Sequence, residues 1–448
     1  MATYNGTNGD DTRIGSTEDD RFYASVGNDR YSGGGGYDSL DYFNLGVAIS
    51  ATIRNATGTS QGNLVQKGSL GYDTFQDIRV IYGSSLDDRL EFAGAASSVN
   101  IYLFGSGGNN TIIGNWVPQI YADYLANSNI PTTVDLEAGY AVNSRSSDSL
   151  RGIVSVRGSN GDDVLYGSSR DNRFQPGAGN NVVDGRGGFD SLYAGADLGA
   201  TVDATSASSG VLTASFGNGA IGRTTYTNIE LILTGNGADI FNGSPENDRF
   251  APAGGNDRLN GGAGFDIVDY GTFSTPPVRG IVANLRTGMV TDIMGAQDIL
   301  ISIEGVRGSR LSDSITGDDN GNLLAGAEGD DFLFGSGGND TLEGGGGSDF
   351  HDGGAGTDIV NISAVARRAG VFAVEADGDV TFRQSSSIDT YRNIESMTFA
   401  DGRMVFDAAD PATQVARLYQ AGLGRGVDQG GLNFWIDQLQ HGKPLSAL

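Results

Sequence analysis

The sequence predicts an all-β protein in which short strands stack into a solenoid, followed by a short C-terminal α-helical segment. Three observations predict this architecture: a six-residue phrase that recurs about every 75 residues, a nine-residue unit rich in glycine and aspartate, and a change of composition after Asp407. A nine-residue unit has too little apolar mass to fold alone, so the units must stack on one another.

The composition disfavours the common alternatives. The chain has 448 residues, 72 of them glycine, and a formal net charge of −27. Ten of its 55 acidic residues are glutamate, which leaves 45 aspartates. Glycine and aspartate are poor helix formers, so an ordinary helical protein is not expected. Nine prolines are too few for collagen, and an apolar share of 38% argues against disorder.

The charge and the cysteine count also bear on partners and location. An acidic chain lacks the clustered Lys and Arg that bind nucleic acid, so we expect no nucleic-acid partner. Without cysteine, disulfide scaffolds and thiolate zinc sites are excluded. The N-terminus shows no conventional secretion signal, and no apolar run is long enough for a transmembrane segment. We expect a soluble protein that leaves the cell, if it does, by another route.

The longer repeat ends on an isoleucine each time. The isoleucines are separated by 75, 76, 74 and 91 residues, and two additional nine-residue units account for the longer last step. A nearly constant step over four intervals indicates a repeat architecture. The five copies occupy residues 73–78, 148–153, 224–229, 298–303 and 389–394.

The shorter repeat is clearest where units begin at 308, 317, 326, 335, 344 and 353. Position 1 is glycine, position 4 is usually glycine, position 6 is Asp or Asn, and position 8 is usually apolar. Earlier blocks keep this phase from residues 6, 158 and 234, whereas the block near 83 and 105 is degenerate. The three residues that end each unit should form a short strand with one side chain inward, and the preceding six should turn tightly.

Stacking these units creates an electrostatic problem. Neighbouring strands lie about 4.8 Å apart, so two stacked carboxylates repel by roughly 3–4 kcal/mol at an effective dielectric of about 20. Several such pairs need a cation. Because the donors are hard oxygens, with no thiolate and two histidines, the sequence favours calcium.

The units GGAGTDIVN (353–361) and GGAGFDIVD (261–269) match the pattern GGxGxDxUx. Over residues 5–405 the chain resembles the RTX family, the hemolysin-type calcium-binding repeat proteins. This resemblance implies a right-handed parallel β-roll/β-solenoid, two nonapeptides per coil, with several Ca²⁺ ions held between turns by aspartates 18 residues apart. The metal ligands so implied are Asp11, Asp20, Asp29, Asp38, Asp163, Asp190, Asp239, Asp248, Asp257, Asp266, Asp313, Asp331, Asp340, Asp349 and Asp358.

Some units depart from the pattern. Arg13 occupies an inward position 8, and Glu18, Arg170 and Glu246 replace the glycine of position 4. Asn110 should leave the second block with little capacity for metal. Three implied pairs contain an amide and are weaker: Asp163/Asn181, Asn172/Asp190 and Asn322/Asp340.

The blocks alternate with spacers of roughly 40 residues that contain strand-like runs, for example at 47–53 and 281–285. They resemble RTX spacer segments, which continue the solenoid without metal. We therefore divide the chain into five segments of a block with its spacer, 1–82, 83–157, 158–233, 234–307 and 308–406. A sixth segment, 407–448, begins with an N-cap aspartate and a proline and resembles the start of a small helical domain found on exported RTX-type proteins.

Enzymatic readings are disfavoured. His351 and His441 lie 90 residues apart, which excludes the HExxH spacing of zinc proteases, and His351 fits a packed position 8. An esterase-like Gly-x-Ser-x-Gly at 58–62 has no plausible base beside Ser60. The paired carboxylates follow the ninefold phase, so a glycosidase is unnecessary to explain them. We expect no enzyme activity.

Taken together, these patterns indicate a secreted, extracellular calcium-binding protein whose roll folds on binding calcium. The resemblance implies export by type I secretion machinery. Two alternatives stay open: a cell-surface, S-layer or adhesin-like structural protein, and an accessory module or enzyme that acts on extracellular polysaccharide.

Overall fold

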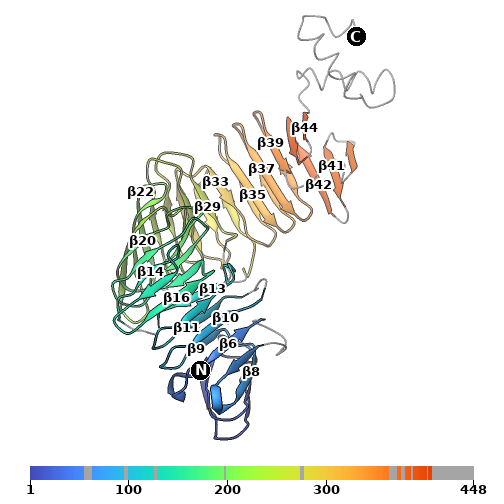
Figure 1. Cartoon of the computed structure of the whole chain (residues 1–448). Helices are drawn as coiled ribbons and strands as arrows, with labels where there is room; N and C mark the ends of the chain where they lie inside the picture. The colour runs from blue at the N-terminus through green and yellow to red at the C-terminus, as the bar shows by residue number, and fades with distance from the viewer. Residues whose placement is uncertain are drawn as a thin grey trace, which may run out of the picture. The chain divides into compact units, whose positions relative to one another are not determined.

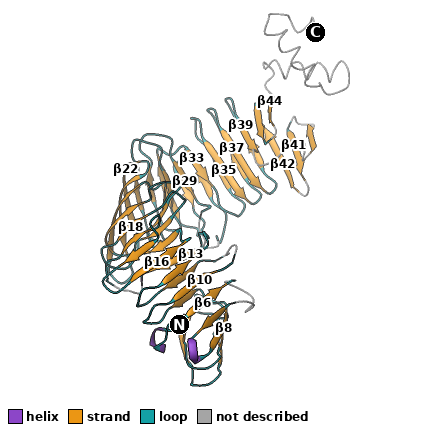
Figure 2. Cartoon of the chain, viewed as in Figure 1, coloured by secondary structure: helices purple, strands orange, loops and turns teal. Residues whose placement is uncertain are grey.

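The computed structural model describes residues 1–54, 63–94, 99–125, 129–195, 198–272, 277–362, 371–374, 379–384, 387–400 and 402–405. It divides into two compact units, Met1–Gly264 (unit 1) and Phe265–Leu448 (unit 2). Strands and turns make up nearly all of it, with two short 3₁₀ helices, η1 (Phe43–Leu45) and η2 (Gly68–Leu70) (Figures 1 and 2). The expected helical segment 407–448 and the Ser60 motif lie outside the described residues.

The nonapeptides form the parallel coils that the repeat predicts. In unit 2, β34 (Ser314–Thr316), β36 (Phe332–Phe334) and β38 (Phe350–Asp352) pair in parallel. Residues 18 apart are in register, so Ile315 pairs with Leu333 and Leu333 with His351. Each strand covers the last three positions of its unit, and position 8 points into the core.

The coils of unit 1 form two sheets. The first is parallel throughout, with the order β1 (Ala2–Asn5), β3 (Asp20–Tyr23), β5 (Ser39–Asp41), β9 (Val80–Tyr82), β11 (Ile101–Phe104), β13 (Ile120–Asp123), β17 (Ser155–Arg157), β19 (Arg173–Gln175), β21 (Ser191–Tyr193), β25 (Leu231–Leu233) and β27 (Arg249–Ala251). The second has the order β2 (Thr12–Ile14), β4 (Arg30–Ser32), β8 (Tyr72–Gln76), β7 (Leu64–Gln66), β6 (Ser50–Ile53), β10 (Arg89–Phe92), β12 (Thr111–Ile113), β16 (Ser147–Arg151), β15 (Tyr140–Val142), β14 (Thr133–Asp135), β18 (Val164–Tyr166), β20 (Gly179–Asp184), β24 (Ile221–Thr227), β23 (Ser209–Ser215), β22 (Ala200–Ser206), β26 (Ile240–Asn242) and β28 (Arg258–Asn260).

Unit 2 repeats this plan. Its first sheet contains β29 (Ile267–Asp269), β33 (Gly305–Arg307), β35 (Leu323–Glu328), β37 (Thr341–Gly346), β39 (Ile359–Ile362) and β43 (Ser396–Phe399) in parallel, and then the antiparallel β44 (Gly402–Val405). Its second sheet has the order β32 (Gln297–Ile301), β31 (Met289–Thr291), β30 (Val282–Asn284), β34, β36, β38, β42 (Ser387–Arg392), β41 (Val380–Gln384) and β40 (Val371–Val374).

The spacers do not simply continue the parallel coils. Each adds three antiparallel strands to the second sheet, and the chain runs backwards through them. In the first spacer, β8 pairs in parallel with β4 of the preceding block, and β6 pairs in parallel with β10 of the next. Strand β7 lies between them and is antiparallel to both. The strands expected at 47–53 and 281–285 correspond to β6 and β30, the first strands of two such meanders.

The recurring phrase is the third strand of each meander and the turn that follows it. The residue before the isoleucine has a positive φ of 50° to 61° in all five copies, which only small or polar residues adopt at low cost. These residues are Asp77, Gly152, Asn228, Ser302 and Asn393. Each isoleucine that follows is buried and directs the chain into the first sheet.

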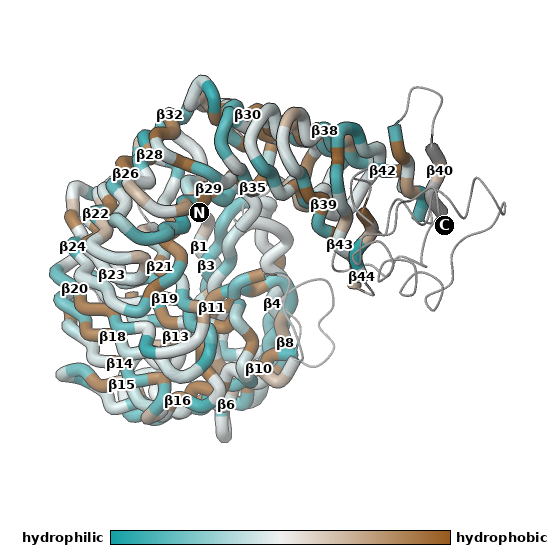
Figure 3. The backbone as a smooth tube through the Cα atoms, turned by 90° about the horizontal axis from the view of Figure 1, so that it is seen from above, coloured by the Kyte–Doolittle hydropathy of each residue, from teal (hydrophilic) through white to brown (hydrophobic). Residues whose placement is uncertain are grey.

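The core runs along the coils as a line of inward side chains. Apolar segments recur strand after strand in both units, as the colouring of Figure 3 shows. Leu333 and Leu342, both at position 8, are fully buried. His351 occupies the same position, is buried, and stacks on Tyr391 with ring centroids 4.8 Å apart. Within the described residues, no helix has the length and apolarity needed to cross a membrane.

Candidate metal sites

The implied ligands line the turns between the two sheets. All fifteen aspartates are buried except Asp11, which is partly exposed. Burial of this many carboxylates is unusual, because an ionised carboxylate needs a partner or a metal to leave water. The partners that each oxygen has therefore show where a cation is needed.

In nine of the stacked pairs, a side-chain oxygen of the later residue bonds to the preceding coil. The main-chain N–H of a position-6 residue donates to a side-chain oxygen of position 6 one coil later, at 2.6–3.0 Å. This contact joins the pairs Asp11/Asp29, Asp20/Asp38, Asp239/Asp257, Asp313/Asp331, Asp331/Asp349 and Asp340/Asp358, and the amide pairs Asp163/Asn181, Asn172/Asp190 and Asn322/Asp340. The members of Asp248/Asp266 belong to different units, and that pair stays a prediction.

Some turns already satisfy the second oxygen, and we call them closed turns. In these, the residue at position 2 donates both its main-chain N–H and its hydroxyl to the position-6 side chain. In the case of Asp313, Ser309 donates at 2.6 Å from its N–H and 2.9 Å from its hydroxyl. The closed turns join Thr7 to Asp11, Ser16 to Asp20, Ser84 to Asp88, Ser159 to Asp163, Ser168 to Asn172, Ser244 to Asp248 and Ser309 to Asp313.

Other turns leave the second oxygen free, and we call them open turns. Among the described residues, Oδ2 of Asp38, Asp190, Asp331, Asp340 and Asp358 is buried and receives no hydrogen bond. In each of these turns the residues at positions 2 and 4 have positive φ, and position 4 is always glycine, for example Ala327 at 90° and Gly329 at 118° in the turn of Asp331. This conformation turns the N–H of position 2 away from the carboxylate.

The carboxyl groups of the open turns have raised pKa values. Burial, with the nearby carboxylates of Asp313 and Asp349, raises the pKa of Asp331 to about 7. Burial likewise raises the pKa of Asp190 to about 7 and that of Asp38 to about 6. In the closed turn of Asp20, the N–H of Ser16 instead lowers the pKa of the carboxyl. Burial also raises the pKa of Asp88, Asp163 and Asp313 in closed turns to about 6, so the open turns are distinguished by the missing hydrogen-bond donor and not by the pKa.

The surroundings of the open turns fit calcium. A Cβ added to Gly335 would overlap both Asp340 Oδ2 and the carbonyl oxygen of Gly353 in the following coil, so these two oxygens face the same small space. The same holds at Gly326 for Asp331 and the carbonyl of Gly344. Within the described residues, no three acidic or histidine side chains converge as a metal-binding group. Main-chain carbonyls must therefore supply much of the six to eight oxygens that calcium takes.

Comparison with family models agrees with this geometry. The RTX calcium-binding nonapeptide repeat, in four copies, matches residues 5–40, 102–116, 157–192, 175–197, 233–268, 316–351 and 325–360. The chain is an RTX repeat protein. A comparison with curated proteins gave no match. The matched residues include every implied aspartate except Asp313, and the calcium-binding repeat therefore accounts for most of the candidate sites.

In the degenerate second block of this RTX protein, the side-chain amide of Asn110 stands at position 6, where other units have aspartate. Asn110 Nδ2 donates to the carbonyls of Gly107 and Gly108, at 3.1 and 3.3 Å, and to Asp148 at 2.9 Å. The amide thus contacts oxygens of the kind that a metal would take. This arrangement agrees with the expectation that the second block holds little metal.

The sequence reading missed the carboxylates that the spacers add to this ladder. Asp73, Asp148 and Asp389, the first residues of three copies of the recurring phrase, accept the coil-to-coil bond on the second sheet. On the first sheet this bond goes to Glu230, Glu304 and Glu395, each directly after the phrase isoleucine. The signal was present, because these acids recur at fixed places in the phrase.

Buried tyrosines satisfy the second oxygen of three spacer aspartates. Tyr124 donates its hydroxyl to Asp148 Oδ2 at 3.1 Å, and the residue before it, Asp123, forms an ion pair with Arg157. The same Asp-Tyr dipeptide recurs in two other repeats. Tyr42 donates to Asp73 at 2.9 Å and Tyr270 to Asp298 at 2.8 Å. These spacer carboxylates are therefore held by hydroxyls.

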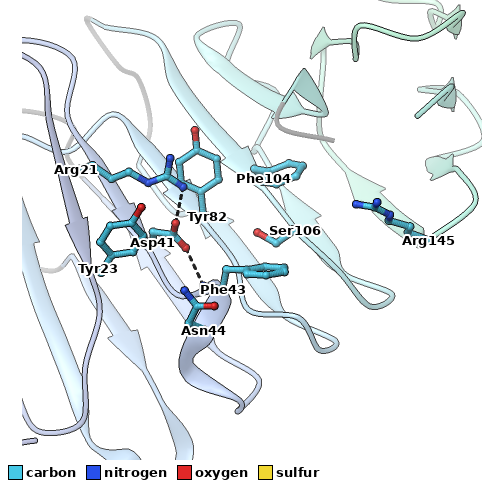
Figure 4. Close-up of a pocket in the computed structure, with 9 residues that line it drawn as sticks. All are labelled: Arg21, Tyr23, Asp41, Phe43, Asn44, Tyr82, Phe104, Ser106 and Arg145. Atoms are coloured by element: carbon cyan, nitrogen blue, oxygen red, sulfur yellow. Dashed lines mark hydrogen bonds and ion pairs between the residues drawn. The ribbon is translucent and has the colours of Figure 1, made fainter. Parts of the chain in front are cut away.

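Unit 1 also contains a pocket of about 300 Å³ at its first spacer (Figure 4). The guanidinium of Arg21 lies 4.9 Å from the ring centre of Tyr82 and donates to Asp41 at 2.5 Å. Asp41 also accepts the N–H of Phe43 at 2.8 Å. The pocket is lined by Arg21, Tyr23, Asp41, Phe43, Asn44, Tyr82, Phe104, Ser106 and Arg145.

Proposed function

We propose that this RTX protein leaves the cell unfolded and folds outside it when its open turns take up calcium, with no catalytic activity of its own. The observation that carries the proposal is the set of five buried carboxylate oxygens that lack a hydrogen-bond donor within the described residues. An unpartnered buried carboxylate is strongly unfavourable, so the folded chain needs a cation at these turns.

The proposed ligands would make folding depend on the calcium concentration of the compartment. Asp38, Asp190, Asp331, Asp340 and Asp358, with main-chain carbonyls of the same turns, would hold calcium. Bound there, calcium would neutralise the carboxylates and complete its oxygen shell. Extracellular calcium modules bind at roughly 10⁻⁴–10⁻³ M, far above cytosolic calcium. In the cytosol the stacked aspartates would therefore repel one another and keep the chain unfolded and fit for export.

The proposed route is a type I exporter, which the family resemblance supports. Co-expression with such an exporter should bring the chain into the medium, and deletion of the exporter should retain it in cells. Appearance in the medium at equal levels without an exporter would contradict this route.

Folding is tested directly by circular dichroism and size-exclusion chromatography of the full chain, in chelator and in about 10 mM calcium, well above the binding range expected of extracellular sites. We expect most of the chain to be expanded and weakly structured in chelator, and a compact β-rich chain in calcium. Magnesium at the same concentration is the control, since it requires a tighter octahedral site. A chain that is equally compact in chelator would overturn the proposal.

A second candidate function, binding of an extracellular polysaccharide, is favoured by the pocket of Figure 4. Its aromatic rings and its Arg, Asp and Asn side chains are groups that bind sugars in many small-molecule sites. Isothermal titration with acidic and neutral oligosaccharides, in wild type and in Tyr82→Ala, tests it. Binding to wild type that Tyr82→Ala abolishes would support this role, and no binding to either protein would exclude it.

A further inference from the structure

On the second sheet, the position-6 side chain of the last nonapeptide before a spacer stacks on the first residue of the recurring phrase, and we call this contact a junction. In two described junctions, Asn110/Asp148 and Asn181/Thr224, the nonapeptide residue is an asparagine, so two carboxylates do not meet. Two others stack one carboxylate on another, Asp29/Asp73 and Asp349/Asp389, with N–H to carboxylate distances of 3.1 and 3.2 Å.

Lys67 lies at the first of these acidic junctions. Its Nζ donates to Asp29 Oδ2 at 3.1 Å, to the main-chain carbonyl of Ser25 at 2.6 Å, and to Asp73 Oδ1. The lysine side chain is completely buried. These acceptors are two carboxylates of successive coils and a turn carbonyl at position 2, which are hard-oxygen ligands of the kind that calcium takes.

The remaining oxygens of this junction are also satisfied. Asp29 Oδ2 accepts hydroxyls from Ser25 and Tyr31, and Asp73 Oδ2 accepts the hydroxyl of Tyr42. Asp29 follows another nonapeptide coil and has the positive-φ glycine of an open turn, Gly27, at position 4. In the five open turns the corresponding oxygen has no donor within the described residues, whereas here it is bound by an ammonium.

A local turn brings the lysine to this place. Lys67 follows β7, and its N–H bonds to the carbonyl of Gly71 at 2.9 Å. The equivalent residues of two other spacers, Asn143 and Asp292, close the same kind of turn with Ser146 and Ala296. Their side chains accept N–H groups of their own turns. Lys67 instead extends into the space between the coils.

We infer that Lys67 is a tethered cation that takes the place of a calcium ion between Asp29 and Asp73. An ammonium offers three donors, and three oxygen atoms receive them here. The first spacer therefore closes on its block without calcium. At the junction of Asp349 and Asp389, Tyr391 donates its hydroxyl to Asp389 Oδ2, but no basic side chain pairs with either carboxylate in the described part of unit 2, so a divalent ion would supply the positive charge there. This inference rests on the proposed calcium-dependent folding.

Hydrogen–deuterium exchange of the full chain tests the inference. In chelator, wild-type peptides covering 24–32 and 72–78 should stay protected, whereas peptides covering 344–352 and 387–394 should lose protection. Calcium should protect both regions. Equal loss of protection at both junctions in chelator would overturn the role of Lys67 alone. A wild type that binds no calcium would overturn the proposed function as well.

Lys67→Met gives the decisive comparison, because methionine keeps the length and removes the charge. We expect this variant to lose protection at 24–32 and 72–78 in chelator, to regain it in calcium, and to bind one calcium ion more than wild type by native mass spectrometry. The matched control is Arg89→Met, which removes an equal charge from a surface pair with Glu91. It should leave protection and ion number unchanged.

The double variant Lys67→Met/Asp73→Asn separates charge from packing. With one carboxylate left at the junction, it should stay protected in chelator and bind no additional ion. A Lys67→Met chain that binds no additional ion, or that stays unfolded in calcium, would overturn the inference.

Discussion

The main-chain N–H of Asp313 donates to Oδ1 of Asp331 in the next coil, at 2.8 Å. The two carboxylates nevertheless differ in whether the second oxygen has a hydrogen-bond donor. Ser309 satisfies Asp313 within its own closed turn, whereas Asp331 Oδ2 has no donor among the described residues. The five open turns follow a coil that is itself a nonapeptide, and the closed turns of Asp88, Asp163 and Asp313 follow a spacer, as the donors to their Oδ1 atoms show. A metal site here needs two consecutive nonapeptide turns.

Asp331→Asn should therefore bind at least one calcium ion fewer than wild type, because Asp331 belongs to two coil-to-coil pairs. The calcium concentration at the folding midpoint should rise accordingly. Native mass spectrometry and calcium titration followed by circular dichroism measure these two quantities.

Asp88→Asn is the matched control. Asp88 is equally buried, but it receives hydrogen bonds from Ser84 and Ile49, and its partner in the next coil is the neutral Asn110. The Asp88→Asn variant should bind as many calcium ions as wild type. Loss of an ion from Asp88→Asn, or none from Asp331→Asn, would contradict the distinction between closed and open turns.

The calcium-free chain should become more stable as the pH falls from about 8 to about 6.5. Asp331 and Asp190 have pKa values of about 7 in the folded state and about 3.9 when unfolded, so the folded state binds more protons between these values. Stability therefore falls as pH rises through this window. The buried His351, with a pKa lowered to about 4, has the opposite sign, but only below about 6.5.

Circular dichroism in chelator at the two pH values measures this effect, as a gain of β-sheet signal at the lower pH. With calcium present the trend should reverse, because protons then compete with the metal for the same oxygens. A β-sheet signal that rises with pH in chelator would show that the aspartates are not protonated in the folded chain.

Tyr124→Phe should destabilise unit 1 by about 1–3 kcal/mol, because it removes the hydroxyl from a buried carboxylate, Asp148. The number of bound calcium ions should stay the same, since a hydroxyl and an amide hold this carboxylate. Tyr140→Phe is the control, because Tyr140 is exposed. Equal unfolding midpoints of the two variants in calcium would disprove the role of Tyr124.

Gly326→Ala should destabilise unit 2 by about 1–3 kcal/mol, the usual cost of overpacking. An added Cβ would overlap Asp331 Oδ2 and lie 2.8 Å from the carbonyl oxygen of Gly344. Gly346→Ala in the next coil has open space around its Cβ and should be neutral. Thermal unfolding in calcium distinguishes them, and a neutral Gly326→Ala would mean that the turn can widen at no cost.

The sequence was sufficient to predict the parallel coils, because position 6 and position 8 recur at a fixed interval and stacking follows from that. Register between Leu333 and His351, and the burial of both, agree with this expectation. The six segment boundaries stay predictions. The backward course of the spacers was not predicted, since alternating apolar residues specify a strand but not its partner.

Whether each turn is open or closed could not be predicted from the sequence either. Ser159 and Ser336 both occupy position 2 of units with glycine at position 4, yet Ser159 lies in a closed turn and Ser336 has a positive φ of 77° in an open one. The difference lies in the coil that precedes each turn. Likewise, nothing in the sequence around Lys67 indicates its role, because only the folded structure brings it between Asp29 and Asp73.

The antiparallel meanders have a geometric consequence. Each spacer adds three strands to the second sheet but one to the first, so the second sheet gains about 10 Å of additional length at a strand spacing of about 4.8 Å. Two sheets packed face to face can accommodate this difference only by bending. Within unit 1, each spacer should therefore bend the coils toward the all-parallel sheet, and deletion of β6 and β7 should reduce this bend.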